Sequence, residues 1–179
     1  MENIKRRGDL AKHFASLGYT KGAEVGVADG RFSFYMCSHI PNLELICVDP
    51  WEPYPENRRY SGISKRDGYR PNEELARIRM APYGAKMMKM MSMDAVREIP
   101  MESLDFVYID AHHDFDYVMQ DIIEWAKRVK KGGVIAGHDY YDFKSSGVRE
   151  AVDAYVRVHK IAKLYLTDER EPSWFFVKR

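Results

Sequence analysis

The chain carries the segment Glu24-Val25-Gly26-Val27-Ala28-Asp29-Gly30. Its first residues belong to a short apolar, β-branched run that begins at Gly22. The pattern predicts a strand over 22–27, a tight turn over 28–30 and a helix over 32–39. The glycines let the backbone pass close to a ligand, and the following helix points its N-terminus at the same place. We therefore expect the first strand, turn and helix of a ligand-binding sheet here.

Strand-like and helix-like patterns alternate on both sides of this segment. Further strands are predicted over 45–48, 85–90, 104–109 and 134–137, and further helices over 9–17, 118–129 and 147–159. Two last strands, over 163–167 and 174–178, are joined by a polar turn that contains Pro172, which predicts a closing hairpin at one sheet edge. Alternation of this kind is typical of an α/β fold with a parallel sheet and helices on both faces.

The length predicts one domain over 1–179, because 179 residues with 45% hydrophobic content bury one core but not comfortably two. Residues 52–83 interrupt the α/β rhythm with four prolines, four tyrosines and a short helix around 72–80. Long excursions inside compact domains tend to be functional, so we interpret this segment as an insertion or lid. An ordinary surface excursion is the alternative.

The charges nearly balance, with 28 Lys and Arg against 27 Asp and Glu, so no basic field points to nucleic acid or an anionic membrane. The cluster Lys5-Arg6-Arg7 is interpreted as a solvated helix end, and Cys37 and Cys47 as buried thiols. No apolar run is long enough to span a membrane. We expect a cytoplasmic protein that binds small molecules, and a homodimer is plausible for a small domain with open sheet edges.

An acidic residue ends the second predicted strand, and it points to a nucleoside cofactor. Asp49 stands 25 residues after Glu24, where a carboxylate can accept hydrogen bonds from both hydroxyls of a ribose. A dinucleotide site wants G-x-G-x-x-G, whereas this chain has E-x-G-x-x-x-G. Glu24 would repel a pyrophosphate but suits the ammonium and sulfonium charges of S-adenosylmethionine. The alternative is that Glu24 is a surface acid beside a tight turn.

Together with later segments, these residues resemble the class I S-adenosylmethionine-dependent methyltransferase superfamily over nearly the whole chain. The matching segments are Glu24 to Gly30 as motif I, Val48-Asp49, Met91-Ser92-Met93-Asp94, and 105–110 with Gly132-Gly133-Val134. More narrowly, the runs 108–117 and 132–140 resemble the small bacterial macrocin-type and cephalosporin-hydroxylase-like methyltransferases. They are also similar to the metal-dependent catechol and caffeoyl-CoA O-methyltransferases.

The superfamily resemblance implies a single-domain Rossmann-like methyltransferase fold with a mostly parallel seven-stranded sheet and a C-terminal antiparallel hairpin. It also implies which residues bind the cofactor. Glu24, Gly26 and Gly30 would surround its methionine part, Asp49 its ribose, and Ser92 with Met93 its adenine; Asp110 would bind its amino group.

The narrower resemblance implies a metal site, because the metal-dependent relatives hold magnesium with an Asp after the fourth strand and an Asp-Asn pair after the fifth. Asp110 and Asp139 match the two aspartates, but Tyr140 replaces the Asn. His138 matches the first acid of an Asp-Asp pair in the macrocin-type proteins, so Asp110, His138 and Asp139 are the implied ligands. An imidazole shifts the preference from Mg²⁺ toward Mn²⁺, iron or zinc.

His113 stands where these relatives carry a catalytic Lys, and an imidazole there can act as the general base. Alternatives remain open for every residue of this cluster. In these alternatives Asp110 binds only the amino group of the cofactor, and His112 and His113 are exposed turn residues that cap the next helix. His138 and Asp139 are then a supporting pair. Three further acids are interpreted as surface charges on the first half of that helix, without a catalytic role: Asp114, Asp116 and Asp121.

The leading functional hypothesis is an O-methyltransferase that acts on a hydroxyl of a small metabolite, a sugar or a phenol, with or without a divalent metal ion. One alternative is a nicotinamide-dependent oxidoreductase, and the absence of G-x-G-x-x-G argues against it. The other is a noncatalytic module that binds the cofactor without turnover. RNA methylation is disfavoured by the near-neutral charge.

Overall fold

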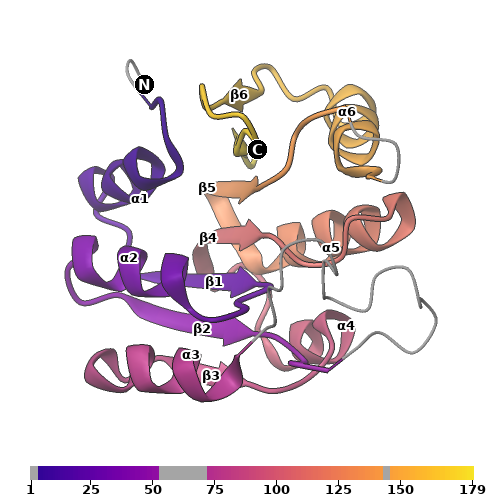
Figure 1. The fold of residues 1–179 in the computed structure, drawn as a ribbon. Helices are drawn as coiled ribbons and strands as arrows, with labels where there is room; N and C mark the ends of the chain where they lie inside the picture. The colour runs from indigo at the N-terminus through magenta and orange to yellow at the C-terminus, as the bar shows by residue number, and fades with distance from the viewer. Residues whose placement is uncertain (1–3, 53–71, 143–145) are drawn as a thin grey trace.

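The computed structural model describes residues 4–52, 72–142 and 146–179 (Figure 1). Its helices are α1 Arg7–Ser16, α2 Arg31–His39, α3 Glu73–Met80, α4 Ser92–Ala95, α5 Phe115–Arg128 and α6 Val148–Val158. Its strands are β1 Lys21–Val25, β2 Glu44–Val48, β3 Lys86–Met88, β4 Leu104–Ile109, β5 Val129–Gly137, β6 Tyr165–Leu166 and β7 Trp174–Val177. Two short 3₁₀ helices, η1 Ala81–Tyr83 and η2 Val96–Glu98, complete the described elements.

The strands form one sheet in the order β3-β2-β1-β4-β5-β7-β6. The first five pair in parallel, and β7 pairs antiparallel with both β5 and β6. The chain builds outward from β1 to β3 and then returns to β4 on the other side of β1. The strand order therefore reverses between β1 and β4, which is where open α/β sheets bind ligands. The Rossmann-like fold, the mostly parallel seven-stranded sheet and the closing hairpin are all confirmed.

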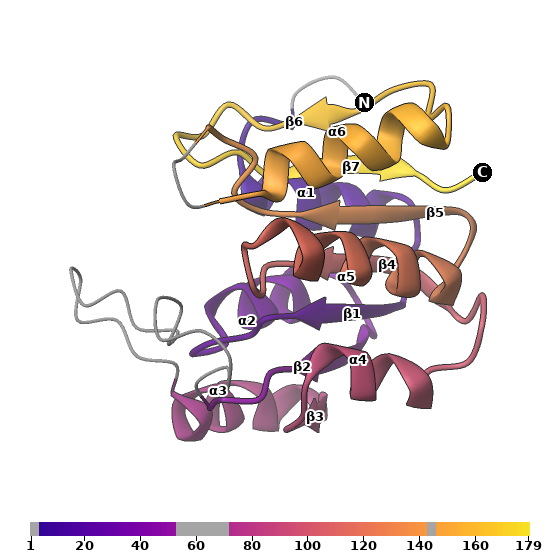
Figure 2. The same ribbon diagram turned by 90° about the vertical axis from the view of Figure 1, so that its right-hand side faces the viewer.

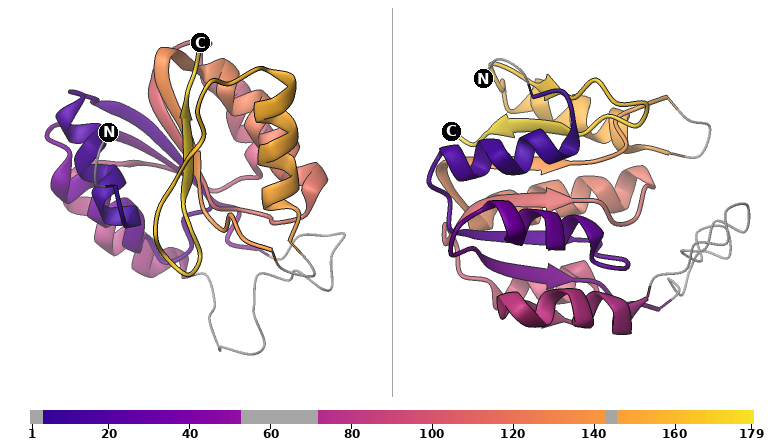
Figure 3. Two further views of the ribbon diagram at one scale, coloured as in Figure 1. Left: turned by 90° about the horizontal axis from the view of Figure 1, so that it is seen from above. Right: turned by 60° about the vertical axis from the view of Figure 1, so that its left-hand side comes forward.

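Helices cover both faces of the sheet, as the view from above shows (Figure 3). On one face α1, α2 and α3 contribute Phe14, Met36 and Met80 to a core with the sheet. On the other face α5 and α6 contribute Trp125 and Val152 to a second core. The apolar positions of these helices recur at helical spacing, so each helix buries one stripe and leaves its polar side in water.

Several boundaries differ from the sequence predictions. The strand predicted over 22–27 ends at Val25, because Gly26 adopts φ +90° and turns the chain away from the sheet. The strand predicted over 134–137 begins earlier, at Val129, and the helix predicted from 118 begins at Phe115.

The segment interpreted as an insertion or lid is only partly described. Its residues 53–71 lie outside the described residues, so the lid stays a prediction. The helix expected around 72–80 is α3, which forms the crossover between the parallel strands β2 and β3.

Candidate active site

The strands β1, β4 and β5 end at one edge of the sheet (Figure 2), and the loops after β1 and β4 touch there. The Asp110 amide donates to the Val25 carbonyl at 2.7 Å. A Cβ atom added to Gly26 would lie 2.0 Å from the carbonyl oxygen of Asp110, far closer than any real contact. Glycine at this position is therefore required by the close approach of the two loops, and it determines where Asp110 lies.

Unusual backbone conformations gather at the same edge. Among the described residues, Ala28, Trp51 and Asp139 have φ values of +53°, +48° and +57°. They follow β1, β2 and β5, and residues other than glycine rarely adopt this conformation. Strained backbone persists where the surroundings impose it, and it is concentrated at functional sites.

Asp49 holds the loop after β1 in place. Its Oδ2 accepts hydrogen bonds from the amides of Val27 at 2.9 Å and Ala28 at 2.8 Å, and its Oδ1 accepts from the amide of Trp51 at 2.7 Å. The Trp51 indole also donates to the Ala28 carbonyl at 2.7 Å. Burial raises the pKa of Asp49, although the three amide bonds oppose this. Its role toward a ribose stays a prediction. Oδ1, which accepts one amide, keeps a second lone pair for a ribose hydroxyl.

Glu24 is buried in β1 rather than exposed beside a turn, so the surface alternative is wrong. Its carboxylate accepts a hydrogen bond from the Ser33 hydroxyl of α2. Burial raises the pKa of Glu24 to about 8, against the opposing effects of the Ser33 bond and the Arg7 charge. Ser33 was missed by the sequence analysis; its position in the first turn of the helix after the glycine loop was the available signal.

Gly30 marks the start of α2 and adopts φ +78°. A Cβ atom here would lie 3.1 Å from the Cα of Ala76, so α3 packs closely against the glycine loop. Asp29 beside it is paired with Arg31 at 2.9 Å and with Arg79 of α3 at 3.0 Å. The loop after β1 is thus fixed from both sides.

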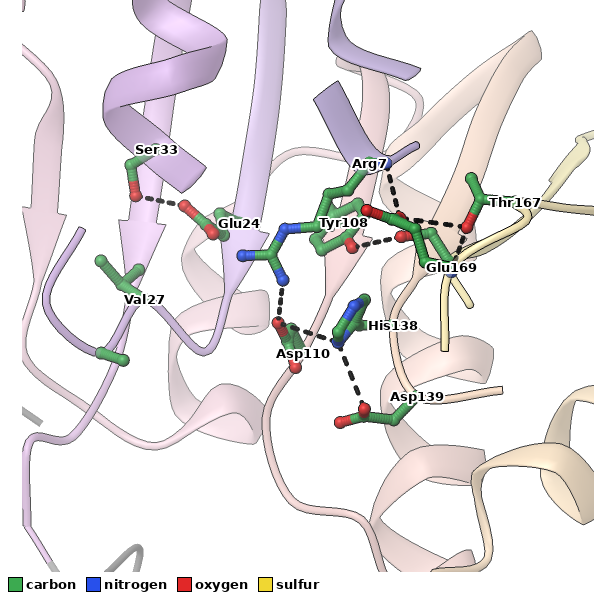
Figure 4. A network of polar contacts seen from close by, with 12 residues as sticks. Arg7, Glu24, Val27, Ser33, Tyr108, Asp110, His138, Asp139, Thr167 and Glu169 are labelled. Atoms are coloured by element: carbon green, nitrogen blue, oxygen red, sulfur yellow. Dashed lines mark hydrogen bonds and ion pairs between the residues drawn. The ribbon is translucent and has the colours of Figure 1, made fainter. Parts of the chain in front are cut away.

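Arg7, in the first turn of α1, extends its side chain into this edge (Figure 4). Its Nη1 lies 2.9 Å from Oδ2 of Asp110, and its guanidinium lies over the rings of Phe32 and Tyr108, 4.3 and 5.6 Å from their centroids. Its own amide donates to the Glu169 carboxylate at 2.7 Å. Sheet, helix and C-terminal hairpin together fix one guanidinium beside the acids.

The interpretation of the basic cluster as a solvated helix end is therefore wrong for Arg7. Lys5 and Arg6 are exposed, and Arg6 is the N-cap of α1, as that interpretation requires. The side chain of Arg7 is only 27% exposed. Sequence carried no signal that separates the three residues, because the acids that Arg7 meets are more than 15 positions away.

Two carboxylates and one imidazole converge after β4 and β5. One ligand atom from each of Asp110, His113 and Asp139 lies within 4.8 Å of the others. His113 Nε2 is 3.0 Å from Oδ2 of Asp139 and 3.9 Å from Oδ1 of Asp110. This donor set fits a divalent ion of the first transition row.

His138 lies at the same cluster but on its other side. Its Nδ1 is 3.3 Å from Oδ1 of Asp139 and 3.8 Å from Oδ2 of Asp110. Burial alone would lower the pKa of His138, but the bond to Asp139 and the charge of Asp110 raise it. Burial opposes ionisation of Asp139, yet both histidines hold the pKa of that carboxyl below its usual value. All four predicted residues are thus brought together, and which imidazole binds a metal stays a prediction.

His112 is not an exposed turn residue. It is buried, its ring stacks on Tyr117 with centroids 4.2 Å apart, and its Nδ1 accepts the amide of Asp114 at 3.1 Å. Burial lowers the pKa of His112. A small pocket opens beside it, with apolar walls that include Val118 and Val148. Such walls strengthen the electrostatic interactions of the neighbouring acids and imidazoles.

Ser92 of α4 is hydrogen-bonded to the buried Asp121 of α5. The Ser92 hydroxyl donates to Asp121, and the Trp125 indole donates to the Ser92 oxygen at 2.8 Å. The interpretation of Asp121 as a surface charge is wrong, since only 4% of the residue is exposed. Asp114 and Asp116 do lie at the start of α5, as N-cap and in the first turn.

We expect Asp121 to make stability fall as pH rises. Burial raises the pKa of Asp121 to about 7, against the opposing Ser92 bond, whereas the unfolded chain titrates near ~3.9. The folded protein therefore holds the proton more tightly, and this contribution is complete below about pH 4 and lost between about pH 4 and 7. The free energy of unfolding can be measured with urea at pH 5, 6, 7 and 8. That of Asp121→Asn should rise relative to that of the wild type by up to about 1.4 kcal/mol per pH unit, up to about pH 7.

The matched control is Asp116→Asn, since Asp116 is exposed on the same helix. Glu24 titrates in the same window in both proteins, so its effect cancels in the difference. Parallel pH profiles of wild type and Asp121→Asn would contradict the shifted pKa.

A family model described as a methyltransferase domain matches residues 23–140 of this chain. The matched region contains the glycine loop, Asp49, Ser92 and the cluster around Asp110 and Asp139. Curated protein sequences gave no match. Among the described residues, no helix is long and apolar enough to cross a membrane.

Solved structures share the fold at low sequence identity. The O-methyltransferase NovP superposes with a TM-score of 0.71 at 16% identity, covering 96% of this chain and 79% of its own. The O-methyltransferase from Bacillus cereus in complex with SAH gives 0.65 at 13% identity, covering 96% and 80%. A protein from Clostridium thermocellum provisionally assigned as an rRNA methylase gives 0.69 at 10% identity, covering 100% of both chains.

Proposed function

Since the chain belongs to the methyltransferase domain family and has the Rossmann-like fold of class I S-adenosylmethionine-dependent methyltransferases, we propose that it methylates a hydroxyl of a small metabolite. The acceptor class is a sugar or a phenol, and a divalent ion, Mn²⁺ or Mg²⁺, assists the reaction. The observation that carries the proposal is the convergence of Asp110, His113 and Asp139 beside the glycine loop. Family membership sets aside the nicotinamide-dependent oxidoreductase.

The residues around the glycine loop fit S-adenosylmethionine. The ligand supplies an electrophilic methyl group on a sulfonium. Glu24 offers a buried carboxyl group to its ammonium, and Gly26 and Gly30 leave the backbone open to close approach. Asp49 and Ser92 remain the proposed partners of the ribose and the adenine. A bound ammonium would favour the ionised form of Glu24, because an opposite charge lowers the pKa of a carboxyl group.

The cluster after β4 and β5 supports transfer to oxygen. A hydroxyl acceptor must lose its proton, and an imidazole at this edge can take it. Asp110, His113 and Asp139 would hold the divalent ion, whose charge lowers the pKa of a hydroxyl bound to it. His138 would orient Asp139 through their contact of 3.3 Å. His113 would act as base instead if His138 completes the ligand set.

Two further observations support the proposed acceptor. NovP and the Bacillus cereus protein are both described as O-methyltransferases, which supports transfer to oxygen. The near balance of 28 basic and 27 acidic residues offers no extended basic field for a nucleic acid and suits a soluble cytoplasmic enzyme. We also propose a homodimer, because a small domain with open sheet edges can pair with a second copy.

Calorimetric titration of the chelator-treated protein with S-adenosylmethionine and, separately, with NAD tests the cofactor. We expect micromolar binding of S-adenosylmethionine and none of NAD. Asp49→Asn should weaken this binding about tenfold or more, because it loses a charged acceptor for the Val27 and Ala28 amides. Glu44→Gln is the matched control, since Glu44 is exposed at the opposite end of the same strand.

Repeating the titrations with Mg²⁺ and Mn²⁺ tests the metal. Tighter binding of NAD than of S-adenosylmethionine, or no binding of the latter, would sink the proposed function. Binding of S-adenosylmethionine with no transfer to any sugar or phenol would favour the noncatalytic module.

A further inference from the structure

Arg7 places a cation among the acids of the proposed cofactor site. Figure 4 shows its guanidinium between the Glu24 and Asp110 carboxylates. Nη1 of Arg7 contacts Oδ2 of Asp110 at 2.9 Å. The family match begins at residue 23, so α1 lies outside it and none of the roles proposed above includes Arg7.

The charges of this corner match one end of the cofactor. The methionine part of S-adenosylmethionine carries an ammonium and a carboxylate on the same carbon. Two acids, Glu24 and Asp110, suit the ammonium. A carboxylate beside them would be repelled unless a cation faced it, and the planar fork of an arginine matches a carboxylate with two parallel hydrogen bonds.

We propose that Arg7 binds the carboxylate of the methionine part of S-adenosylmethionine. In the free protein the guanidinium is paired with Asp110. In the complex it binds the ligand carboxylate, either in addition to Asp110 or in place of it. Glu24 and Asp110 then face the ligand ammonium. The inference rests on the proposed cofactor. It makes Arg7 a residue that selects ligands carrying both the ammonium and the carboxylate of the methionine part.

The structure holds the guanidinium ready for this role. Its position over the rings of Phe32 and Tyr108 restricts its rotamers. The start of α1 is tied to the C-terminal hairpin, because Glu169 accepts the Arg7 amide and the Asp168 amide donates to the Lys5 carbonyl at 2.8 Å. A donor fixed in advance loses little entropy when the ligand arrives.

Calorimetric titration with two probes tests the inference. One is S-adenosylmethionine, and the other is decarboxylated S-adenosylmethionine, which keeps the ammonium and lacks the carboxylate. We expect the wild type to prefer S-adenosylmethionine, and Arg7→Met to weaken its binding by about 10- to 100-fold. Binding of the decarboxylated probe should not weaken, so the preference should disappear. Arg7→Lys should keep part of it.

The decarboxylated probe also reports whether the variant is folded, because its binding needs the same loops but not the carboxylate contact. Arg6→Met, at the exposed neighbouring residue, should leave both affinities unchanged. Equal losses for the two probes in Arg7→Met, or no loss for either, would overturn the inference while the proposed function stands. If the wild type binds neither probe, the proposed function itself fails.

Discussion

Replacing Gly26 by alanine is expected to abolish binding of S-adenosylmethionine and to destabilise the fold by about 2–5 kcal/mol. The added Cβ would lie 2.0 Å from the Asp110 carbonyl oxygen, at a residue with φ +90°. Two backbone segments would have to separate at the point where the strand order reverses. Urea unfolding and calorimetric titration with S-adenosylmethionine measure the two effects.

Gly132→Ala is the control that separates backbone strain from steric overlap. Gly132 adopts φ +79°, but a Cβ atom there would meet nothing within 4 Å. It should cost only about 1–2 kcal/mol and leave cofactor binding intact. Equal costs for the two variants would mean that the loops after β1 and β4 separate easily, and that Gly26 is needed for its conformation alone.

The second large effect is expected from Asp139→Asn. This change removes one carboxylate from the cluster while keeping the backbone, because asparagine tolerates the positive φ of +57° at this residue. We expect the heat of Mn²⁺ binding to disappear and methyl transfer to fall by roughly 100-fold or more. Cofactor binding measured without metal should change little, since Asp139 follows β5 and not the glycine loop.

Two histidine variants then decide which imidazole binds the metal. His113 is the imidazole that converges with Asp110 and Asp139, so His113→Ala should remove Mn²⁺ binding. His138→Gln should weaken it only about 10- to 100-fold, as expected for a group that orients a ligand. The reverse order would return His138 to the ligand set implied by the sequence and leave His113 as the base. Transfer that stays at the wild-type rate in Asp139→Asn would exclude a role for the metal.

Sequence reasoning reached most of the fold, because each helix and strand is encoded by a local apolar period. The strands around Leu45 and Leu104 and the helix over 32–39 were found within one or two residues. The predicted bounds of an element were less accurate where a backbone turn, rather than a change in the side-chain pattern, terminates it, as at Gly26. The lid remains a prediction, because residues 53–71 lie outside the described part of the chain.

The candidate site divides in the same way. The sequence by itself determined the glycine loop, the acids Asp49, Asp110 and Asp139, and the two histidines, because these residues follow strands directly and parallel strands end at one edge. The sequence did not reveal that Asp121 is buried against Ser92. Nor did it reveal that the side chain of Arg7, unlike those of Lys5 and Arg6, lies between Glu24 and Asp110. Only the tertiary structure decided those contacts, because they join residues far apart in the chain, and no local pattern records which distant charge a side chain will meet once the sheet has formed.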